Sequence, residues 1–548
     1  MLNRPRRGRA PLVAVGLLAV VAVAVPIAAG WANRPLSSTA PGPSSTEPIV
    51  GGVPSEAIPS PTARITHPPA EAALRVAVVP VTQFRTPWTN TTRDEVLAVL
   101  AGTSERYAAL ELVAGDADEI LYQLGTTRPA DTTRLVEAAD GAALAADLAA
   151  HRDRLAFLRA DEVTPGIHAL SWNGLALFGG GRVASLEDWP LAILEMPVVA
   201  ARRPATEMAY DPDAAWTLVA GGDILLDRGV KLSIDAHGVD FPFDGGTAEI
   251  TGHTCCSQFG WEVPKTRRTG HEGDVRSLIE SADLAIANFE NPAPVKYRFH
   301  SSGTVFTANP AYIEGLANVG IDYVSLANNH IRDAGGAGIL QTIEALDGFG
   351  LAHSGAGANL AAARTPAMLE PTSDGPTVAI LGYDTIAGGY TASADRAGSA
   401  RLTAVTVAED VAAARAAGAD IVIVFPHWGT EYKAQPFAAQ RQLAKACIDA
   451  GADLVIGNHA HWAGAVEIYN GKPIWYALGN FVFDQSWSEP TMEGITLELT
   501  FNGSRLVQAV MRPHIILDKA QPNFLDPAGD GAVVMNQVFN ASKNTLPW

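Results

Sequence analysis

The chain has 548 residues, too many for one ordinary hydrophobic core, so its length predicts several domains. Its hydrophobic content of 47% and charged content of 18% are globular values and exclude a wholly disordered chain. The formal net charge of -19 argues against a nucleic-acid partner, because phosphate binding needs clustered Lys and Arg.

The first segment, residues 1–32, has the pattern of a signal-anchor. Four arginines (Arg4, Arg6, Arg7 and Arg9) precede an uncharged apolar stretch over residues 11–29, which is long enough to span a bilayer. The basic flank predicts a single-pass membrane protein whose residues after Trp31 lie outside the cytoplasm. A cleaved signal peptide is the alternative, because the small residues at 28–30 could form a cleavage site.

Residues 33–72 are rich in Pro, Ser, Thr and Gly and predict a flexible linker. Residues 73–205 alternate strand and helix patterns, with strands expected at 74–79 and 155–158 and helices at 92–100 and 131–151. This alternation predicts a smaller α/β domain. It resembles part of a periplasmic solute-binding domain, and a structural or partner-docking role is equally open.

Residues 214–518 repeat one unit: a helix, a glycine-type stop, a short apolar strand and a polar cluster. The strands are expected at 284–287, 323–327, 421–425 and 454–457. Continuous apolar strands indicate sheets covered by helices on both faces, so this region is also predicted to be α/β. Residues 519–548 carry no recognisable motif and are expected to form a C-terminal tail.

Polar residues come shortly after these four strands and after a fifth strand expected at 216–220. They are Asp223; Asn288 and Glu290; Asn328, Asn329, His330 and Asp333; His427 and Glu431; and Asn458, His459 and His461. In open α/β sheets, ligands bind at the carboxyl ends of the strands. We therefore expect these side chains to converge on one site.

The residue types at these strand ends predict a metal site. The chain has 3 cysteines and no Cys-x-x-Cys pattern, so the ligands must be His, Asp, Glu and Asn. Imidazole together with carboxylate and amide oxygen suits Zn, Mn or Fe better than Ca. One or two such ions could polarise a water molecule, with a carboxylate bridging them if there are two.

Six motifs in this region resemble the CapA family of bacterial capsule (poly-γ-glutamate) synthesis proteins, which is similar to calcineurin-like metallophosphatases. They are GGDILLDRG, ANFENP, VSLANNHIRDAG, FPHWGTEY, LVIGNHAHW and YALGNFVFD, in family order between Gly221 and Asp484. The resemblance implies a sandwich of two sheets flanked by helices.

The resemblance also implies roles for individual residues. The metal ligands would be Asp223, Glu290, Asn329, His427, His459 and His461, and His330 would be the catalytic residue facing the leaving group. Behind them, Asp333 and Glu431 would orient histidines, and Asn328 and Asn480 would support the loops. One departure bears on the number of metals: Ile224 and Leu225 follow Asp223, where metallophosphatases usually have Asp-x-His.

Other interpretations of these residues remain open. Glu290 could cap a helix, Asn328 and Asn329 could form a simple turn, and Asp333, Glu431 and Asn480 could be solvated or turn residues. Cys255 and Cys256 are expected in a surface loop, with their pairing undetermined.

The leading functional hypothesis is a metal-dependent hydrolase or transferase, anchored in the membrane, that acts in synthesis, export or anchoring of poly-γ-glutamate or a related envelope polymer. Membrane-embedded capsule synthase subunits are the expected partners. A non-catalytic polymer- or partner-binding assembly factor is the first alternative, and a solute-binding or sensor protein is the second. Serine hydrolase, NTPase and dehydrogenase motifs are absent from the sequence.

Overall fold

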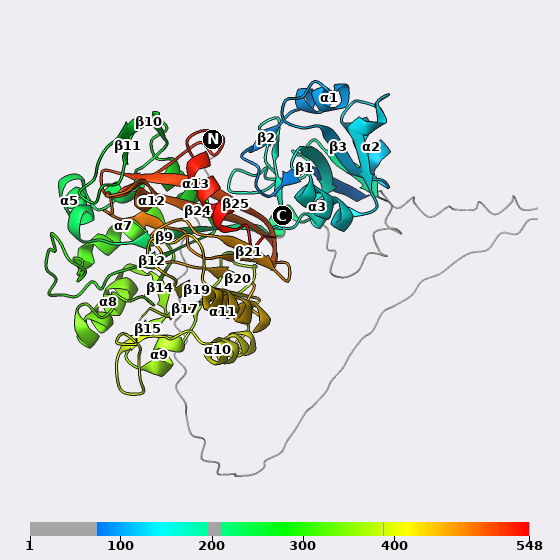
Figure 1. Cartoon of the computed structure of the whole chain (residues 1–548). Coiled ribbons are helices and arrows are strands. Elements are labelled where there is room, and N and C mark those ends of the chain that lie inside the picture. Colours follow the sequence, from blue (N-terminus) through cyan, green and yellow to red (C-terminus); the bar gives the residue numbers. More distant parts are fainter. Residues whose placement is uncertain (1–73, 196–209, 387, 547–548) are drawn as a thin grey trace, which may run out of the picture. The chain divides into compact units, whose positions relative to one another are not determined.

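The computed structural model of the protein describes residues 74–195, 210–386 and 388–546 (Figure 1). The expected membrane segment (1–32) and linker (33–72) lie outside the described residues, so both remain predictions. Within the described ranges, no helix combines the length and apolarity needed to cross a bilayer.

Residues 74–195 build a mixed sheet covered by helices. Its strands lie in the order β4 (Leu135–Ala138), β3 (Ala109–Val113), β5 (Arg154–Arg159), β1 (Leu74–Gln83) and β6 (Ile167–Ala169), and β8 (Ala192–Glu195) also pairs with β1. The helices are α1 (Arg93–Ala101), α2 (Ala117–Gln123) and α3 (Gly141–Ala150), and the short strands β2 (Asn90–Thr91) and β7 (Ser171–Trp172) pair with each other. The predicted α/β character of this region is confirmed.

The helix expected over residues 131–151 is wrong in its first half. Residues 135–138 form β4, which pairs in parallel with β3. The side chain of Asp140 accepts a hydrogen bond from Ala143 N and starts α3 at Gly141. An N-cap inside the apolar pattern therefore divides it into a strand and a helix.

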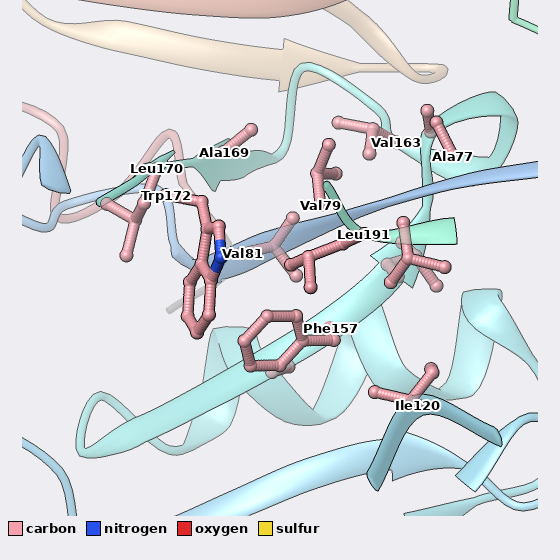
Figure 2. Close-up of a cluster of buried hydrophobic side chains, with 14 of the residues drawn as sticks. Ala77, Val79, Val81, Ile120, Phe157, Val163, Ala169, Leu170, Trp172 and Leu191 are labelled. Atoms are coloured by element: carbon pink, nitrogen blue, oxygen red, sulfur yellow. The ribbon is translucent and has the colours of Figure 1, made fainter. Parts of the chain in front are cut away.

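The core of this first sheet is built around β1. Figure 2 shows Val79 and Val81 of β1 beside Phe157 of β5, with Trp172, Leu170 and Leu191 around them. The rings of Phe157 and Trp172 meet edge to face, with their centroids 5.5 Å apart. Aromatic pairs in this geometry stabilise a core beyond the area that they bury.

Residues 210–546 contain two large sheets. The eight-stranded sheet has the order β14 (Ala352–Ser354), β13 (Tyr323–Ser325), β12 (Leu284–Phe289), β9 (Ala215–Ile224), β24 (Glu493–Asn502), β25 (Arg505–Leu517) and β26 (Gln521–Phe524), and β23 (Asn480–Val482) pairs with β9. The six-stranded sheet has the order β16 (Ala367–Leu369), β17 (Val378–Asp384), β19 (Ile421–His427), β20 (Leu454–Ile456), β22 (Lys472–Trp475) and β21 (Val466–Tyr469).

The two sheets pack face to face and helices cover their outer faces. Leu218 of β9 and Ile423 of β19 belong to one buried cluster between the sheets. The alternate residues Val219 and Val422 point the other way, into clusters shared with helices. The helices are α5 (Arg228–His237), α6 (Asp274–Ser281), α7 (Ile313–Val319) and α8 (Gly335–Phe349) on the first sheet, and α10 (Ala404–Ala416) and α11 (Ala438–Asp449) on the second (Figure 1). Burial on both faces explains the continuous apolar strands.

Shorter elements complete this region. They are the hairpin β10 (Ala248–Thr254) and β11 (Val263–Arg268), the paired β15 (Ala356–Gly357) and β18 (Gly398–Ser399), and the helices α9 (Leu360–Arg364), α12 (Glu489–Met492) and α13 (Ala532–Ala541). Cys255 and Cys256, which follow β10, form a disulfide with each other, and Cys447 is a buried free thiol. Residues 519–548, expected as a tail, carry β26 and α13, whose Val534 and Val538 are buried in the core.

Glu493, the first residue of β24, is a buried carboxyl group that forms no ion pair with a residue in the described parts of the chain. Its side chain is 1% exposed, and Oε1 has no hydrogen-bond partner among the described residues. Burial, with a smaller effect from Glu489, raises the pKa of Glu493 from 4.5 to about 8. The folded chain therefore holds this proton more tightly than the unfolded chain, and stability is lost as the pH rises from about 4.5 to about 8.

We expect Glu493→Gln to gain stability over the wild type as the pH rises from 5 to 8, by an amount on the order of 2 kcal/mol. Urea unfolding of both proteins at the two pH values measures this difference. Parallel pH dependence of the two proteins would contradict the account of Glu493.

Candidate metal centre

The predicted ligands converge where the two sheets meet. Asp223 lies near the end of β9, Glu290 directly follows β12, and Asn329 follows β13; all three belong to the eight-stranded sheet. His427 ends β19, and His459 and His461 follow β20, in the six-stranded sheet. Within each sheet these strands run parallel, so their carboxyl ends lie at one edge.

Glu290 lies at the centre of the site. Its Oε1 is 3.6 Å from His427 Nε2, 3.7 Å from His461 Nε2 and 4.0 Å from His330 Nε2. The side chain is fully buried, and neither oxygen has a hydrogen-bond partner among the described residues. A buried carboxylate without hydrogen-bond partners, surrounded by imidazole nitrogens, is the group of ligand atoms expected around a bound cation.

Two groups of ligand atoms share Glu290. One group is Glu290, His427 and His459, and the other is Asp223, Glu290 and His461. The ligand atoms within each group lie within 4.8 Å of one another. Bonds of about 2.0–2.2 Å from His and carboxylate to zinc fit such spacings. The residues present therefore fit one or two divalent ions.

The titration behaviour of the site favours a bound cation. Burial, followed by the charge of Asp223, raises the pKa of Glu290 well above its usual value. Burial, followed by neighbouring imidazoles, lowers the pKa of His427 and His459 well below theirs, so both rings are neutral near pH 7. Neutral imidazole is the form that binds metal, and a divalent ion would allow Glu290 to ionise.

Two asparagines hold the ring of His427. Its Nε2 lies 2.8 Å from Asn329 Oδ1 and 3.0 Å from His459 Nδ1. On the other side of the ring, Asn288 Nδ2 lies 3.2 Å from His427 Nδ1 and donates to Asp223 Oδ1 at 2.7 Å. Asn288, which was expected to converge on the site but had no individual role, thus joins the two sheets there.

His461 is oriented by Asn480. His461 Nδ1 lies 2.8 Å from Asn480 Oδ1, while the amide nitrogen of Asn480 donates to Gln485 Oε1 and Thr491 O. Because that amide nitrogen is committed as a donor, Asn480 accepts from Nδ1 of His461. In the neutral ring, Nδ1 then carries the proton, and Nε2 is the nitrogen that faces Glu290.

The backbone after β20 is held in an uncommon conformation. His459 and His461 have φ values of 90° and 57°, in the left-handed region that few non-glycine residues adopt. The backbone N–H of His459 donates to Asp223 Oδ2 at 3.2 Å and ties this loop to β9. Strain of this kind persists where the surrounding structure holds it, and it is concentrated at functional sites.

His330 lies beside Glu290, and Asp333 orients its ring. Its Nδ1 is 3.0 Å from Asp333 Oδ2, which leaves Nε2 facing the site. Asn328 supports the same turn, since its amide donates to Phe289 O and its oxygen accepts from His330 N. Glu431, by contrast, is exposed and makes no hydrogen bond or ion pair with a histidine in the described parts of the chain.

Asn458 was expected among the converging residues but had no individual role. It precedes His459, and both polar atoms of its side chain are buried without a hydrogen-bond partner among the described residues. Its position shortly after a strand is the signal that predicted its convergence on the site.

Comparison with known proteins decides the family. Residues 217–485 match the family described as bacterial capsule synthesis protein PGA_cap. A protein of Mycobacterium tuberculosis named "probable polyglutamine synthesis accessory protein" is 30% identical over 301 residues, which cover 76% of its length. The chain belongs to the PGA_cap family. This membership confirms the resemblance to CapA proteins.

Two further relatives of this chain carry the CapA name. "Capsule biosynthesis protein CapA" of Bacillus anthracis is 28% identical over 54% of this chain, and "PGA biosynthesis protein CapA" of Bacillus subtilis is 34% identical over 39% of it. The matches span 66% and 57% of those two proteins, less than two thirds of each. A solved 5'-nucleotidase precursor from Thermus thermophilus aligns with 60% of this chain and 58% of its own at 12% identity, but its TM-score of 0.32 is too low to carry an inference.

The PGA_cap match contains the whole candidate site. Asp223, at the start of the matched range, and Asn480, near its end, both lie inside it. The sheet built by residues 74–195 and the strands β24 to β26 lie outside. The site therefore belongs to the part of this protein that is common to the PGA_cap family.

Proposed function

We propose that this PGA_cap protein is a metal-dependent hydrolase or transferase that acts on a capsule polymer. The observation that carries the proposal is Glu290, a fully buried carboxyl group with no hydrogen-bond partner among the described residues and with three histidine nitrogens within 4.0 Å. Such a group is unfavourable in a protein without a bound cation. The two facing sheets with outer helices agree with a metallophosphatase-like sandwich.

The two ligand groups would each hold one ion of Mn, Zn or Fe, with Glu290 shared between them. A bound ion of this kind supplies Lewis-acid chemistry and an activated water. His330 has a separate role in the proposal. Its Nδ1 is held by Asp333, so its Nε2 can give a proton to the leaving group or take one from the nucleophile.

The proposed substrate is poly-γ-glutamate or a related envelope polymer. Support comes from the names of the relatives, which refer to capsule, PGA or polyglutamine synthesis. Membrane-embedded capsule synthase subunits are the proposed partners. Both hydrolysis and transfer fit this setting, since either reaction could trim, release or attach a finished chain.

We also propose that residues 1–32 anchor the protein and that the rest lies outside the cytoplasm. Support comes from the arginine flank and the uncharged stretch that follows it. Protease treatment of intact, wall-stripped cells is expected to degrade the region around the candidate site. Full protection of that region would contradict this topology.

A non-catalytic role in polymer binding is favoured by one observation. Ile224 and Leu225, which occupy the positions after Asp223 where a metallophosphatase would place a histidine, are apolar and fully buried. The first ion would thus have fewer ligands than in those enzymes. In this alternative, the metal would serve to hold the two sheets together.

Turnover by the metal-loaded protein separates the two functions. The proposed enzyme should release product from a phosphodiester, a phosphomonoester or a γ-glutamyl amide, and a chelator should abolish that release. A protein that binds metal but acts on none of the three substrates would favour the polymer-binding role.

A further inference from the structure

An arginine lies at the edge of the candidate metal centre, between two phenylalanines that each pack on a site histidine. The guanidinium carbon of Arg228 is 5.0 Å from the ring centre of Phe306 and 5.6 Å from that of Phe483. Phe306 packs on His330, with 4.5 Å between ring centres, and Phe483 packs on His461, with 5.0 Å. These two histidines lie within 4.0 Å of Glu290.

The guanidinium of Arg228 has hydrogen-bond donors that are not used within the described residues. Its side chain is 12% exposed, and Nη2 donates to Asp484 Oδ1. Nε is buried without a hydrogen-bond partner, and Nη1 makes no hydrogen bond within the described ranges. Arginine carries five N–H donors in a planar fork, so most of this capacity is unused.

Two backbone donors at Arg228 and its neighbour are already satisfied. Arg228 is the first residue of α5, and its N–H donates to Asp227 Oδ1 at 2.7 Å. The N–H of Gly229 donates to Asp484 Oδ2 at 2.8 Å. These two N–H groups are therefore not open, and a ligand beside them would meet the guanidinium itself.

The backbone of Arg228 is also strained. Its φ is 50°, which is uncommon for a residue with a side chain. A strained, largely buried arginine at this place is poorly explained by a surface ion pair alone.

We propose that Arg228 binds an anionic oxygen of the substrate, a carboxylate or a phosphate, beside the bond that is processed at the metal centre. The inference rests on the proposed function and narrows its substrate class to anionic polymers. The two phenyl rings exclude water from the guanidinium, which strengthens a charge-assisted hydrogen bond. A neutral polysaccharide would leave this donor unpaired.

The test is equilibrium binding of two probes, inorganic phosphate and a γ-linked glutamate oligomer, to the metal-loaded full chain. Arg228→Gln should lower the binding affinity for at least one probe by about tenfold or more, the usual contribution of a charge-assisted hydrogen bond. If only the affinity for the oligomer falls, Arg228 binds a carboxylate of the polymer. If only the affinity for phosphate falls, Arg228 binds a phosphate group. Unchanged affinity for both probes would overturn the proposal.

The control is Arg276→Gln on α6, because Arg276 also pairs with a carboxylate, Asp244 at 2.7 Å, and contacts no site residue among those described. It should leave both affinities unchanged. Metal content and melting temperature report whether each variant is folded. If Arg228→Gln does not fold, Arg228→Lys replaces it, since it keeps the charge but loses the fork, and its affinities should be weaker than wild type.

Failure of the proposed function gives a different result from failure of this inference. If the wild type binds no metal, the proposed function fails, and the same two probes applied to the metal-free chain still test Arg228. If metal binds normally and Arg228→Gln changes the affinity for neither probe, only the proposed role of Arg228 is wrong.

Discussion

Replacing Glu290 with glutamine should abolish metal binding and at the same time make the metal-free protein more stable than the wild type. Glu290 belongs to both ligand groups, so the change removes a ligand from each. We expect metal affinity to fall by more than about a hundredfold. Mutations of residues that only orient the ligands already lower metal affinity by about 10- to 100-fold. Opposite effects on affinity and stability are expected of a ligand and not of a structural carboxylate.

The gain in stability follows from the pKa of Glu290, which is raised well above 4.5 in the folded, metal-free chain. Stability is therefore lost as the pH rises above about 4.5 towards the folded value, and glutamine does not titrate. We expect a gain on the order of 2 kcal/mol near pH 8 and little gain near pH 4.

Urea unfolding in the presence of a chelator measures this gain, and titration with Mn²⁺ or Zn²⁺ measures affinity. Glu493→Gln is the matched control, because it also removes a buried carboxyl group with a raised pKa but lies outside both ligand groups. It should raise stability without changing metal content. Normal metal binding by Glu290→Gln would contradict the assignment of the centre.

The second large effect is expected at His330. His330→Ala should lower turnover by about a hundredfold, the scale of a positioned general acid or base, while metal content stays nearly unchanged. His330 belongs to neither ligand group, and its Nε2 is 4.0 Å from Glu290 Oε1. His459→Ala, in contrast, should lose metal and activity together.

Asp333→Asn should give a smaller loss, about tenfold, because it changes the acceptor that orients His330 Nδ1. His151→Ala is a suitable control, because His151 also pairs with an aspartate, Asp147, at 3.0 Å. It is exposed and lies in the sheet region of residues 74–195, outside the candidate site. If His330→Ala loses metal as readily as His459→Ala, then His330 is a ligand and the separation of roles is wrong.

Much of the site could be placed from the sequence because its residues follow strands that are easy to recognise. Asp223, Glu290 and His427 come directly at the ends of apolar runs, and parallel strands bring such ends together. The family motifs then assigned each residue its expected role. The α/β character of both regions followed from the same alternation of strand and helix.

Other contacts depend on packing between segments that are distant in the chain. Asn288 bonds Asp223 of its own sheet and His427 of the other, so its role depends on how the sheets face each other. Arg228 lies near the centre only because Phe306 and Phe483 fold against it from separate loops. Neither arrangement leaves a periodic pattern in the sequence.

Local signals that were overlooked explain the remaining differences. Asp140 is an N-cap within what looked like one long helix, and residues 135–138 before it pair as a strand instead. The strand at 521–524 is short and polar, but it pairs with β25 and extends the larger sheet. In both places, pairing with a neighbouring strand decides the structure.

The metal content of the purified full chain tests the central claim most directly. The chain is stripped with a chelator, reloaded with Mn, Zn or Fe, separated from free ions and analysed for metal per polypeptide, alongside Glu290→Gln. The account predicts between one and two ions per wild-type chain, consistent with the two ligand groups that share Glu290, and none in the variant. A wild type that retains no ion, or a variant that retains as many as the wild type, would contradict it.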